Sequence, residues 1–334
     1  MVKKMSEVFF ITSPEGGERR KYFPDRLLDR LKEYGEVRIN PLPHKPSEEE
    51  LCRIAPDATV LLTHWGAPRI GARYLDAAPG LKLLAHCAGS VARIASEEVY
   101  ARGIPVISAN AVMAKYVAEA VLGLMIAAAR SFKEYDALLT AGVWTKSLPM
   151  TSLLDATVGL VGLGTVGREL LNLLAPFGTR VLVYDPYLPD DALEPWPDAE
   201  RVGLDEALGA DVVSVHASKT PETYHLMDAA AFEKMRDGAV FINTARGALV
   251  DTPAARAAIE RKHLRAAFDV YEEENGPQPM LSGLPAILLQ PHVAASPAGA
   301  SMTAAIVDEI DRFFAGQPLT LTIGIGQFRR MTIE

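Results

Sequence analysis

The chain of 334 residues has little cysteine, no long apolar run and no excess of positive charge. Its two cysteines, Cys52 and Cys87, cannot form a disulfide framework or a cysteine-rich metal site, which fits a reducing cytoplasm and no bound metal. The longest apolar stretch, residues 120–129, has ten residues, whereas a membrane span needs about 20. The net charge of −8 repels phosphate backbones, so nucleic acid is not an expected partner.

The first residues show no targeting signal, because the apolar run at 8–11 is too short for the core of a signal peptide. With 49% hydrophobic and 23% charged residues, the composition is that of an ordinary globular protein. At roughly 150 residues per domain, the length predicts two domains. We therefore expect a cytoplasmic protein that does not bind membranes.

Short β-rich runs alternate with helical patterns from end to end. Most of the runs are continuously apolar, which is typical of parallel strands covered by helices on both faces. The alternation predicts an α/β fold with doubly wound parallel sheets. The predicted strands are residues 8–12, 37–40, 59–63, 82–86 and 105–108, followed by 157–161, 180–184, 212–216, 239–243, 266–270 and 287–290.

These strands are more numerous than a single sheet usually contains, so we expect the first five in one sheet and the other six in a second. Helical patterns cover residues 168–175 and 253–262. The long pattern at 114–132 could belong to either half. The last pattern, at 300–314, could return to the first domain and make that domain discontinuous.

A glycine-rich loop joins the predicted strand 157–161 to a helical pattern. Gly162 allows a tight turn, Gly164 lets the backbone approach a pyrophosphate, and Gly167 lets the helix pack on the strand. The next strand ends at Asp185, where a carboxylate would bind the ribose hydroxyls of NAD and repel a 2′-phosphate. The pattern predicts a dinucleotide site that takes NAD.

Three chemically competent residues follow later strands, at the sheet edge where α/β proteins bind ligands. Arg246 can clamp a carboxylate with two hydrogen bonds, and His292 can exchange a proton near neutral pH. Glu274 beside the histidine would favour its imidazolium form. Together they suit the reduction of a 2-oxo acid, although an isolated arginine or histidine is more often a surface or structural residue.

These motifs resemble the D-isomer-specific 2-hydroxyacid dehydrogenases over nearly the whole chain. The matching segments occur in the family's order and at similar spacing, which makes the resemblance specific. They are residues 158–167, 216–223, 241–251, 267–274 and 291–292.

The resemblance implies a role for each matched residue. Arg246 would bind the substrate carboxylate, His292 would be the acid/base, and Glu274 its partner. Asp269 would hold the nicotinamide carboxamide. The implied cofactor-binding residues are Gly162, Gly164, Thr165, Val166, Gly167, Asp185, His216, Thr244, Ala245 and Asp269.

The resemblance also implies the domain organisation. A flavodoxin-like substrate domain would comprise residues 1–108 and 296–334, and an inserted Rossmann NAD-binding domain residues 109–295. In the family, the long helix of the inserted domain forms a dimer, so 114–132 is a candidate dimer element. The apolar content of this helix is equally that of a buried core helix.

The first domain departs from the family around residues 87–93. The family has a Gly-Val-Gly or Gly-Ala-Gly loop that holds the substrate carboxylate, but this chain has Ala88, Gly89 and Ser90, followed by Arg93. Arg93 could bind an acidic substrate or point to solvent. Trp65 could cap the substrate side chain or pack in the core.

A smaller ambiguity lies in the Glu272-Glu273-Glu274 run, where a shift of one residue would select Glu273 as the partner of His292. The predicted function is NAD-dependent hydride transfer to or from a small D-2-hydroxy acid, with glyoxylate or hydroxypyruvate reduction and phosphoglycerate oxidation both open. Phosphite oxidation, which uses a similar triad, also stays open. The alternative is a non-catalytic, NAD-dependent scaffold that resembles the family's corepressors.

Overall fold

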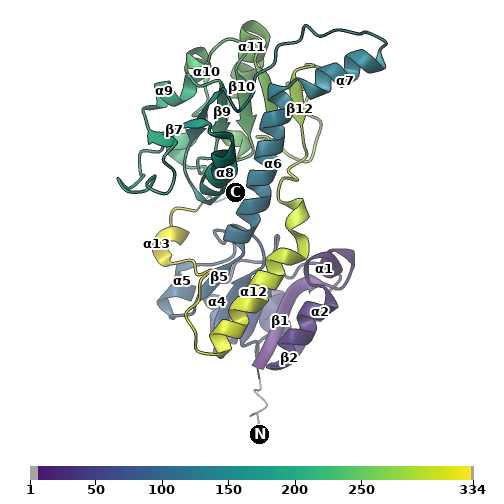
Figure 1. Cartoon of the computed structure of the whole chain (residues 1–334). Helices are drawn as coiled ribbons and strands as arrows, with labels where there is room; N and C mark the ends of the chain where they lie inside the picture. The colour runs from purple at the N-terminus through teal and green to yellow at the C-terminus, as the bar shows by residue number, and fades with distance from the viewer. Residues whose placement is uncertain (1–6, 332–334) are drawn as a thin grey trace. The chain divides into compact units, whose positions relative to one another are not determined.

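The computed structural model describes residues 7–331, which divide into two compact units (Figure 1). One unit comprises the described parts of Met1–Met113 and Pro297–Glu334, and the other comprises Ala114–Ser296. The units divide at residues 113 and 296, the first of which lies within helix α6 (Asn110–Ala129). The substrate-domain and NAD-domain boundaries after residues 108 and 295 stay predictions.

The first unit contains a parallel sheet with the strand order β2-β1-β3-β4-β5. Every residue of β3, β4 and β5 is buried, because helices cover both faces of the sheet. This explains why these strands read as unbroken apolar runs in the sequence. The strands are β1 (Glu7–Pro14), β2 (Gly35–Asn40), β3 (Val60–Thr63), β4 (Leu83–His86) and β5 (Val106–Ser108).

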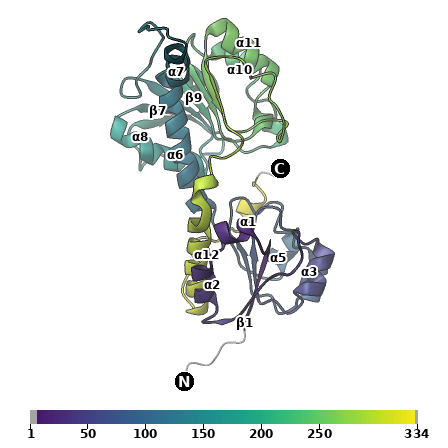
Figure 2. The ribbon, with the colours of Figure 1, turned by 90° about the vertical axis from the view of Figure 1, so that its right-hand side faces the viewer.

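Helices lie on both sides of this sheet (Figure 2). The C-terminal helix α12 packs with α1 and α2 on one side, and α3, α4 and α5 form the layer on the other. The core under the second layer includes Phe10, Leu51 and Tyr74. The helices are α1 (Gly17–Tyr22), α2 (Asp25–Leu31), α3 (Glu48–Ile54), α4 (Ala72–Ala77), α5 (Glu97–Ala101), α12 (Gly299–Phe314) and α13 (Ile325–Phe328).

The second unit contains a seven-stranded parallel sheet in the order β12-β11-β10-β9-β6-β7-β8. The prediction of six strands here is wrong, because it omits the edge strand β8 (Ala199–Arg201). None of the three residues of β8 is buried, so β8 lacks the apolar signal of the other strands. Those strands are β6 (Thr157–Val161), β7 (Arg180–Tyr184), β9 (Val212–Val215), β10 (Val240–Asn243), β11 (Arg265–Phe268) and β12 (Ile287–Leu289).

Within this unit, α10 and α11 lie on one side of the sheet and α6 and α8 on the other (Figure 2). The largest core contains Phe232, Phe241 and Phe268. The helices that complete the unit are α7 (Phe132–Thr140), α8 (Thr165–Leu174), α9 (Leu204–Leu208), α10 (Ala229–Lys234) and α11 (Thr252–Lys262). The short 3₁₀ turns are η1 (Ala175–Phe177), η2 (Pro221–Thr223), η3 (Gly247–Leu249) and, at the unit boundary, η4 (Ser296–Ala298).

The predicted helix 114–132 differs from the structure at both ends. Helix α6 begins at Asn110 and ends at Ala129, and α7 is a separate helix that begins at Phe132. Ser131 between them has a φ of 51°, a left-handed conformation that ends α6. Among the described residues, α6 is the one helix whose length and hydropathy would suffice to cross a membrane, although eight of its residues are buried in the protein.

Candidate active site

Three adjacent strands of the second unit carry the predicted catalytic residues at their carboxyl ends. Arg246 follows β10, Glu274 follows β11 and His292 follows β12, and these strands are consecutive neighbours in the sheet. Parallel strands deliver their carboxyl ends to one edge, which is where ligands of open α/β sheets bind. The topology therefore brings residues that are far apart in the sequence to the same side of this unit.

The side chains of His292 and Glu274 form a direct contact. His292 Nδ1 lies 3.0 Å from a carboxylate oxygen of Glu274, so the imidazole donates this hydrogen bond when Nδ1 carries a proton. The carboxylate that contacts His292 belongs to Glu274 and not to the alternative, Glu273. With Nδ1 held in this way, Nε2 is the nitrogen that can exchange a proton with a substrate.

The turn that carries Arg246 packs against the loop that carries Glu274. A Cβ atom on Gly247 would lie 1.8 Å from the carbonyl carbon of Tyr271, so only glycine permits this approach. Asn243, which is fully buried, also braces the turn: its side chain donates to the carbonyl of Arg246 and accepts from the N–H of Ala245. Sequence analysis did not identify either Gly247 or Asn243 as a supporting residue.

Asp269 has a structural contact that the sequence did not predict. Its side chain is 1% exposed, and its two oxygens accept hydrogen bonds from the backbone N–H groups of Val293 and Ala294, at 2.8 and 3.0 Å. His292, directly before them, has a φ of 54°. Asp269 thus holds the turn that presents His292. Its predicted contact with the nicotinamide stays a prediction.

The glycine loop has the features that a dinucleotide requires. Gly162 has a φ of 94°, and a Cβ there would lie 2.6 Å from the backbone nitrogen of Ala217. No atom lies within 4 Å of a Cβ built on Gly164, so the backbone at that position is open to a ligand. Thr165 and Val166 open helix α8, whose N-terminal N–H groups can bind phosphate, and Gly167 lies in its buried face.

Asp185 stands beside this loop at the end of β7. Its carboxylate accepts hydrogen bonds from the backbone N–H groups of Leu163 and Tyr187, each at 2.9 Å. These contacts orient the carboxylate next to the glycine loop. The position is the one at which Rossmann domains bind the ribose hydroxyls.

Three further predicted cofactor residues follow β9 and β10 at the same edge of the sheet. The backbone of His216 borders Gly162, its Nε2 is 2.9 Å from the hydroxyl of Ser214, and burial lowers the pKa of its imidazole to about 4. Thr244 is buried, and its hydroxyl has no hydrogen-bond partner among the described residues. Such an orphaned hydroxyl suits contact with a bound cofactor. Ala245 follows it in the turn braced by Asn243.

The remaining predicted residues belong to the first unit and follow β3 and β4. Ala88 and Gly89 are buried, and their carbonyls both accept hydrogen bonds from the hydroxyl of Ser108. Ser90 is partly buried and Arg93 is exposed, with interactions of their own. Trp65 is 38% exposed and contacts His64, a buried residue that sequence analysis passed over.

These features define a class: an α/β protein with a Rossmann NAD-binding domain and a histidine–carboxylate pair at the edge of its sheet. Residues 122–294 match the model of the family described as D-isomer specific 2-hydroxyacid dehydrogenase, NAD binding domain. The chain is 35% identical over 285 residues to a glyoxylate reductase of Thermofilum pendens, covering 83% of this chain and 84% of that protein.

Other relatives agree with this assignment. A D-3-phosphoglycerate dehydrogenase of Mycobacterium leprae is 37% identical over 259 residues, covering 76% of this chain and 48% of that protein. The chain thus spans about half the length of the phosphoglycerate dehydrogenases that it matches. A glyoxylate reductase from Paecilomyes thermophila has the same fold, with a TM-score of 0.75 at 22% identity over 95% of this chain and 98% of that one. The chain belongs to the D-isomer specific 2-hydroxyacid dehydrogenase family.

Proposed function

We propose that the protein catalyses NAD(H)-dependent interconversion of a small 2-oxo acid and the corresponding D-2-hydroxy acid. The observation that carries the proposal is the 3.0 Å contact between His292 and Glu274 at the sheet edge, beside the turn that bears Arg246. This edge presents an acid/base pair and a guanidinium on rigid strand ends. The family membership of the chain supports the same reaction class.

The residues around the glycine loop fit NAD as the cofactor. Gly164 leaves the backbone open for a pyrophosphate, and the orphaned hydroxyl of Thr244 offers a polar contact. Asp185 would accept hydrogen bonds from the ribose hydroxyls and repel a 2′-phosphate, which selects NAD over NADP. When bound, NAD supplies the redox chemistry by donating or accepting a hydride.

Each catalytic residue then has a distinct task. Arg246 binds the substrate carboxylate through two parallel hydrogen bonds, which orients the adjacent carbonyl carbon. In reduction, His292 donates a proton from Nε2 to the oxygen at C2, and in oxidation it takes that proton back. Glu274 accepts the hydrogen bond from Nδ1 and stabilises the imidazolium.

The test is to follow NADH absorbance with glyoxylate, hydroxypyruvate, pyruvate, 2-oxoglutarate, phosphohydroxypyruvate and phenylpyruvate. We expect turnover of at least one acid, and its loss in His292→Ala while NADH still binds, because that substitution removes the proton donor and leaves the glycine loop intact. Unchanged turnover in His292→Ala would refute the acid/base role. No turnover with any of these acids, despite NADH binding, would refute the proposed activity.

The proposed substrate is either an unphosphorylated acid or a phosphorylated one. Relatives of the chain are named as glyoxylate and hydroxypyruvate reductases, and others as phosphoglycerate dehydrogenases. The acid panel separates them, because phosphohydroxypyruvate and hydroxypyruvate differ by the phosphoryl group alone. Arg93 and Trp65 in the first unit are the side chains that we propose to examine in this choice.

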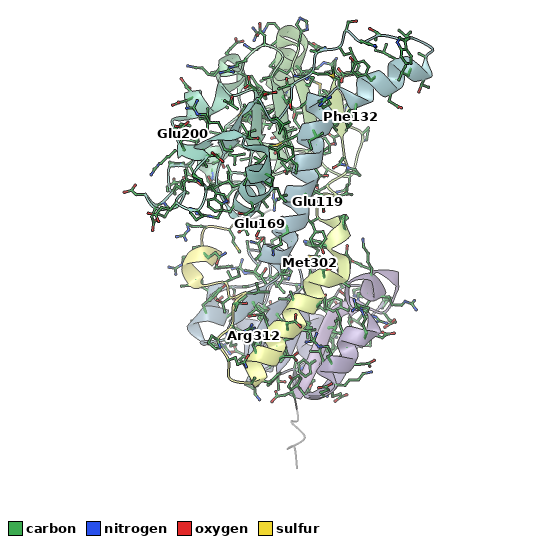
Figure 3. All side chains as sticks on the ribbon, in the orientation of Figure 1. Glu119, Phe132, Glu169, Glu200, Met302 and Arg312 are labelled. Carbon is green, nitrogen blue, oxygen red and sulfur yellow. The ribbon has the colours of Figure 1, made fainter. Side chains whose placement is uncertain are left out.

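We also propose that the protein is a homodimer. Helix α7 and the segment after it extend from the second unit (Figure 1) and carry exposed apolar side chains. Phe132, labelled in Figure 3, begins α7, and Trp144 beyond it is 81% exposed. An exposed apolar patch of this kind marks an interaction site, and a second copy of the chain is the occupant consistent with the family.

Sedimentation of the wild type and of a Leu139→Glu, Trp144→Ser double variant tests the dimer. We expect a dimer for the wild type and a monomer for the variant, because the substitutions place polar groups on the patch. A monomeric wild type would refute the proposal.

We further propose a cytoplasmic protein without nucleic-acid or membrane partners. Support comes from the two free cysteines, of which Cys87 is buried, and from the acidic net charge. Cell fractionation tests the location, and recovery in a membrane pellet would contradict it.

A further inference from the structure

The first unit has a topological switch point of its own. Its strand order, β2-β1-β3-β4-β5, is the flavodoxin-like order, in which the chain reverses direction across the sheet between β1 and β3. Ligands of such sheets bind in the crevice outside the carboxyl ends of the two strands at the reversal. Here the segment after β1 leads through Gly16 into α1, and the segment after β3 begins with His64 and Trp65.

His64, directly after β3, is buried without a polar partner among the described residues. The residue is 1% exposed, and neither Nδ1 nor Nε2 has a hydrogen-bond partner among the described residues. Three aromatic rings surround the imidazole: Tyr22 at 4.0 Å, Trp65 at 4.5 Å and Phe23 at 5.9 Å between ring centroids. This burial lowers the pKa of His64 to about 3, so the ring is neutral at physiological pH.

Two polar neighbours of His64 have partners of their own, whereas both nitrogens of its ring have none among the described residues. His86, one strand away, lies with its Nδ1 2.9 Å from the hydroxyl of Thr63. Lys45, which approaches Gly66, forms an ion pair with Glu18 at 2.9 Å. A buried polar group left without a partner is destabilising, so the protein would be more stable with an apolar residue in this aromatic setting. A ligand that supplies the missing hydrogen bond would account for histidine at this position.

We propose that His64 is a specificity-determining residue that binds a hydroxyl group on the side chain of the substrate. A neutral imidazole presents one donor and one acceptor, and a hydroxyl can pair with either nitrogen, whereas an alkyl group can pair with neither. The implied substrate class is a 2-oxo or 2-hydroxy acid with an additional, uncharged hydroxyl group. This inference rests on the proposed function.

Access to the ring requires one of its aromatic neighbours to move. Tyr22 and Phe23 are buried, whereas Trp65 is partly exposed and meets His64 edge-on, at an interplanar angle of 76°. Trp65 is therefore the ring that can swing outward as a hydroxyl approaches. In this arrangement Trp65 shields the hydrogen bond from water after the ligand has bound.

An isosteric pair of substrates tests the proposal. Hydroxypyruvate and 2-oxobutyrate have the same number of heavy atoms, but only the first has a hydroxyl group on C3. We expect the wild type to prefer hydroxypyruvate by about 100-fold or more in kcat/KM, because a site that binds a hydroxyl discriminates strongly against its absence. In His64→Phe, which keeps an aromatic ring without hydrogen bonds, this ratio should fall by at least tenfold. His64→Gln, which keeps a donor and an acceptor, should retain most of the preference.

The control is His44→Phe, the same substitution at an exposed histidine of the first unit, and it should leave the ratio unchanged. A wild-type ratio near one, or the wild-type ratio in His64→Phe, would overturn the proposal. If His64→Phe does not fold, His64→Met takes its place with the same expected loss. A strong preference for phosphohydroxypyruvate that disappears in Lys45→Met would also overturn it, in favour of a phosphate subsite.

The failure of the proposed function would look different. If no 2-oxo acid is reduced, calorimetric binding of D-glycerate and D-2-hydroxybutyrate still tests His64 without turnover. Tighter binding of D-glycerate to the wild type, lost in His64→Phe, would support the hydroxyl site. Equal affinities in the wild type, or the same difference in both proteins, would overturn it and indicate that water alone occupies the crevice.

Discussion

Asp269 connects the buried sheet to the turn that carries His292. Its carboxylate accepts from two consecutive N–H groups, those of Val293 and Ala294, and the residue before them, His292, has a left-handed backbone. A left-handed conformation is uncommon for a residue other than glycine, although histidine adopts it more readily than most, and it persists where its surroundings enforce it. Two charge-assisted hydrogen bonds from a buried carboxylate provide that enforcement.

We therefore expect Asp269→Asn to lower kcat by about 10- to 100-fold, because an amide can accept only one of the two hydrogen bonds and His292 is no longer held. Steady-state kinetics and fluorescence titration of NADH measure the two effects separately. If NADH affinity fell as much as kcat, the cofactor contact of Asp269 would dominate, and the positioning role would be refuted.

The glycine loop offers a pair of substitutions that separate folding from cofactor binding. Gly164→Ala adds a methyl group into open space, so the free energy of unfolding should change by less than about 1 kcal/mol. Because the pyrophosphate needs this space, the Kd for NADH should rise at least about tenfold. Gly162→Ala should instead destabilise the fold by about 3 kcal/mol, since φ is positive and the backbone of Ala217 is in the way.

Urea unfolding and NADH titration of both variants check this contrast. Equal effects of the two substitutions on folding would contradict it. So would unchanged NADH binding by Gly164→Ala.

At the residue scale, the sequence predicted which candidate catalytic residues lie at one sheet edge, but not which residues hold them in place. The positions of Arg246, Glu274 and His292 beyond strand ends follow from local patterns, because each lies in the loop after a recognisable strand. Gly247 became apparent only in the structure, since its role depends on close approach to Tyr271, which is distant in the sequence. The role of Asn243 rests on local hydrogen bonds to Ala245 and Arg246, which the apolar pattern of the strand does not reveal. The isolation of His64 likewise depends on rings from α1 and the turn after it.

At the scale of elements, the buried Arg265 holds together the end of α6 and the segment that follows α7. Arg265 lies in β11, is buried, and donates to the carbonyls of Ala129, Pro149 and Gly238 and to the hydroxyl of Thr151. One guanidinium thus ties the end of α6 to the segment after α7. Burial lowers the pKa of Arg265, but its ordinary value is high enough for the group to remain charged.

Arg265→Met should destabilise the second unit by about 3 kcal/mol, because it removes four hydrogen bonds at once and leaves the carbonyl of Gly238 without its donor. The segment between α7 and β6 should also become more sensitive to protease. Urea unfolding and limited proteolysis measure the two effects, with Arg261→Met, a substitution of an exposed arginine on α11, as the control. A proteolysis pattern identical to that of the wild type would refute the anchoring role.

Element boundaries were predictable where apolar pattern and turn chemistry agree. The strands β6 and β7 have the predicted bounds, because each is an apolar run that ends in a glycine or aspartate turn. The break at Ser131 was not predictable, since the apolar pattern continues through Phe132 while the backbone turns at a serine. The strand β8 was not predicted, because an exposed edge strand has no buried face and therefore no apolar pattern in the sequence.

For the whole molecule, both units have the same architecture. This explains why the fold class could be predicted from the sequence and why the boundary between the units could not. Each unit is a parallel sheet covered by helices, so the alternation of strands and helices reports the fold class at once. The same alternation does not mark where one sheet ends and the next begins. The first division lies inside α6, where a continuous helix has no linker composition to reveal it.

Three histidines, two buried in the first unit and one partly buried in the second, couple the stability of the molecule to pH. Burial lowers the pKa values of His64 and His86 to about 3, and that of His216 to about 4, from an ordinary value of 6.5. Below pH 6.5 the unfolded chain takes up protons at these positions while the folded chain does not. The free energy of unfolding therefore falls as the pH decreases from about 6.5 towards the folded pKa values, and it is fully retained above pH 6.5.

We expect a loss of up to about 2 kcal/mol per buried histidine between pH 7 and pH 5, at about 1.4 kcal/mol per pH unit. Urea unfolding at pH 7, 6 and 5 measures it. His86→Leu should make the free energy of unfolding less dependent on pH, because the substitution removes one of these groups. His44→Gln, at an exposed histidine, should leave the dependence as in the wild type. If the wild type were as stable at pH 5 as at pH 7, these histidines would not be neutral and buried in solution.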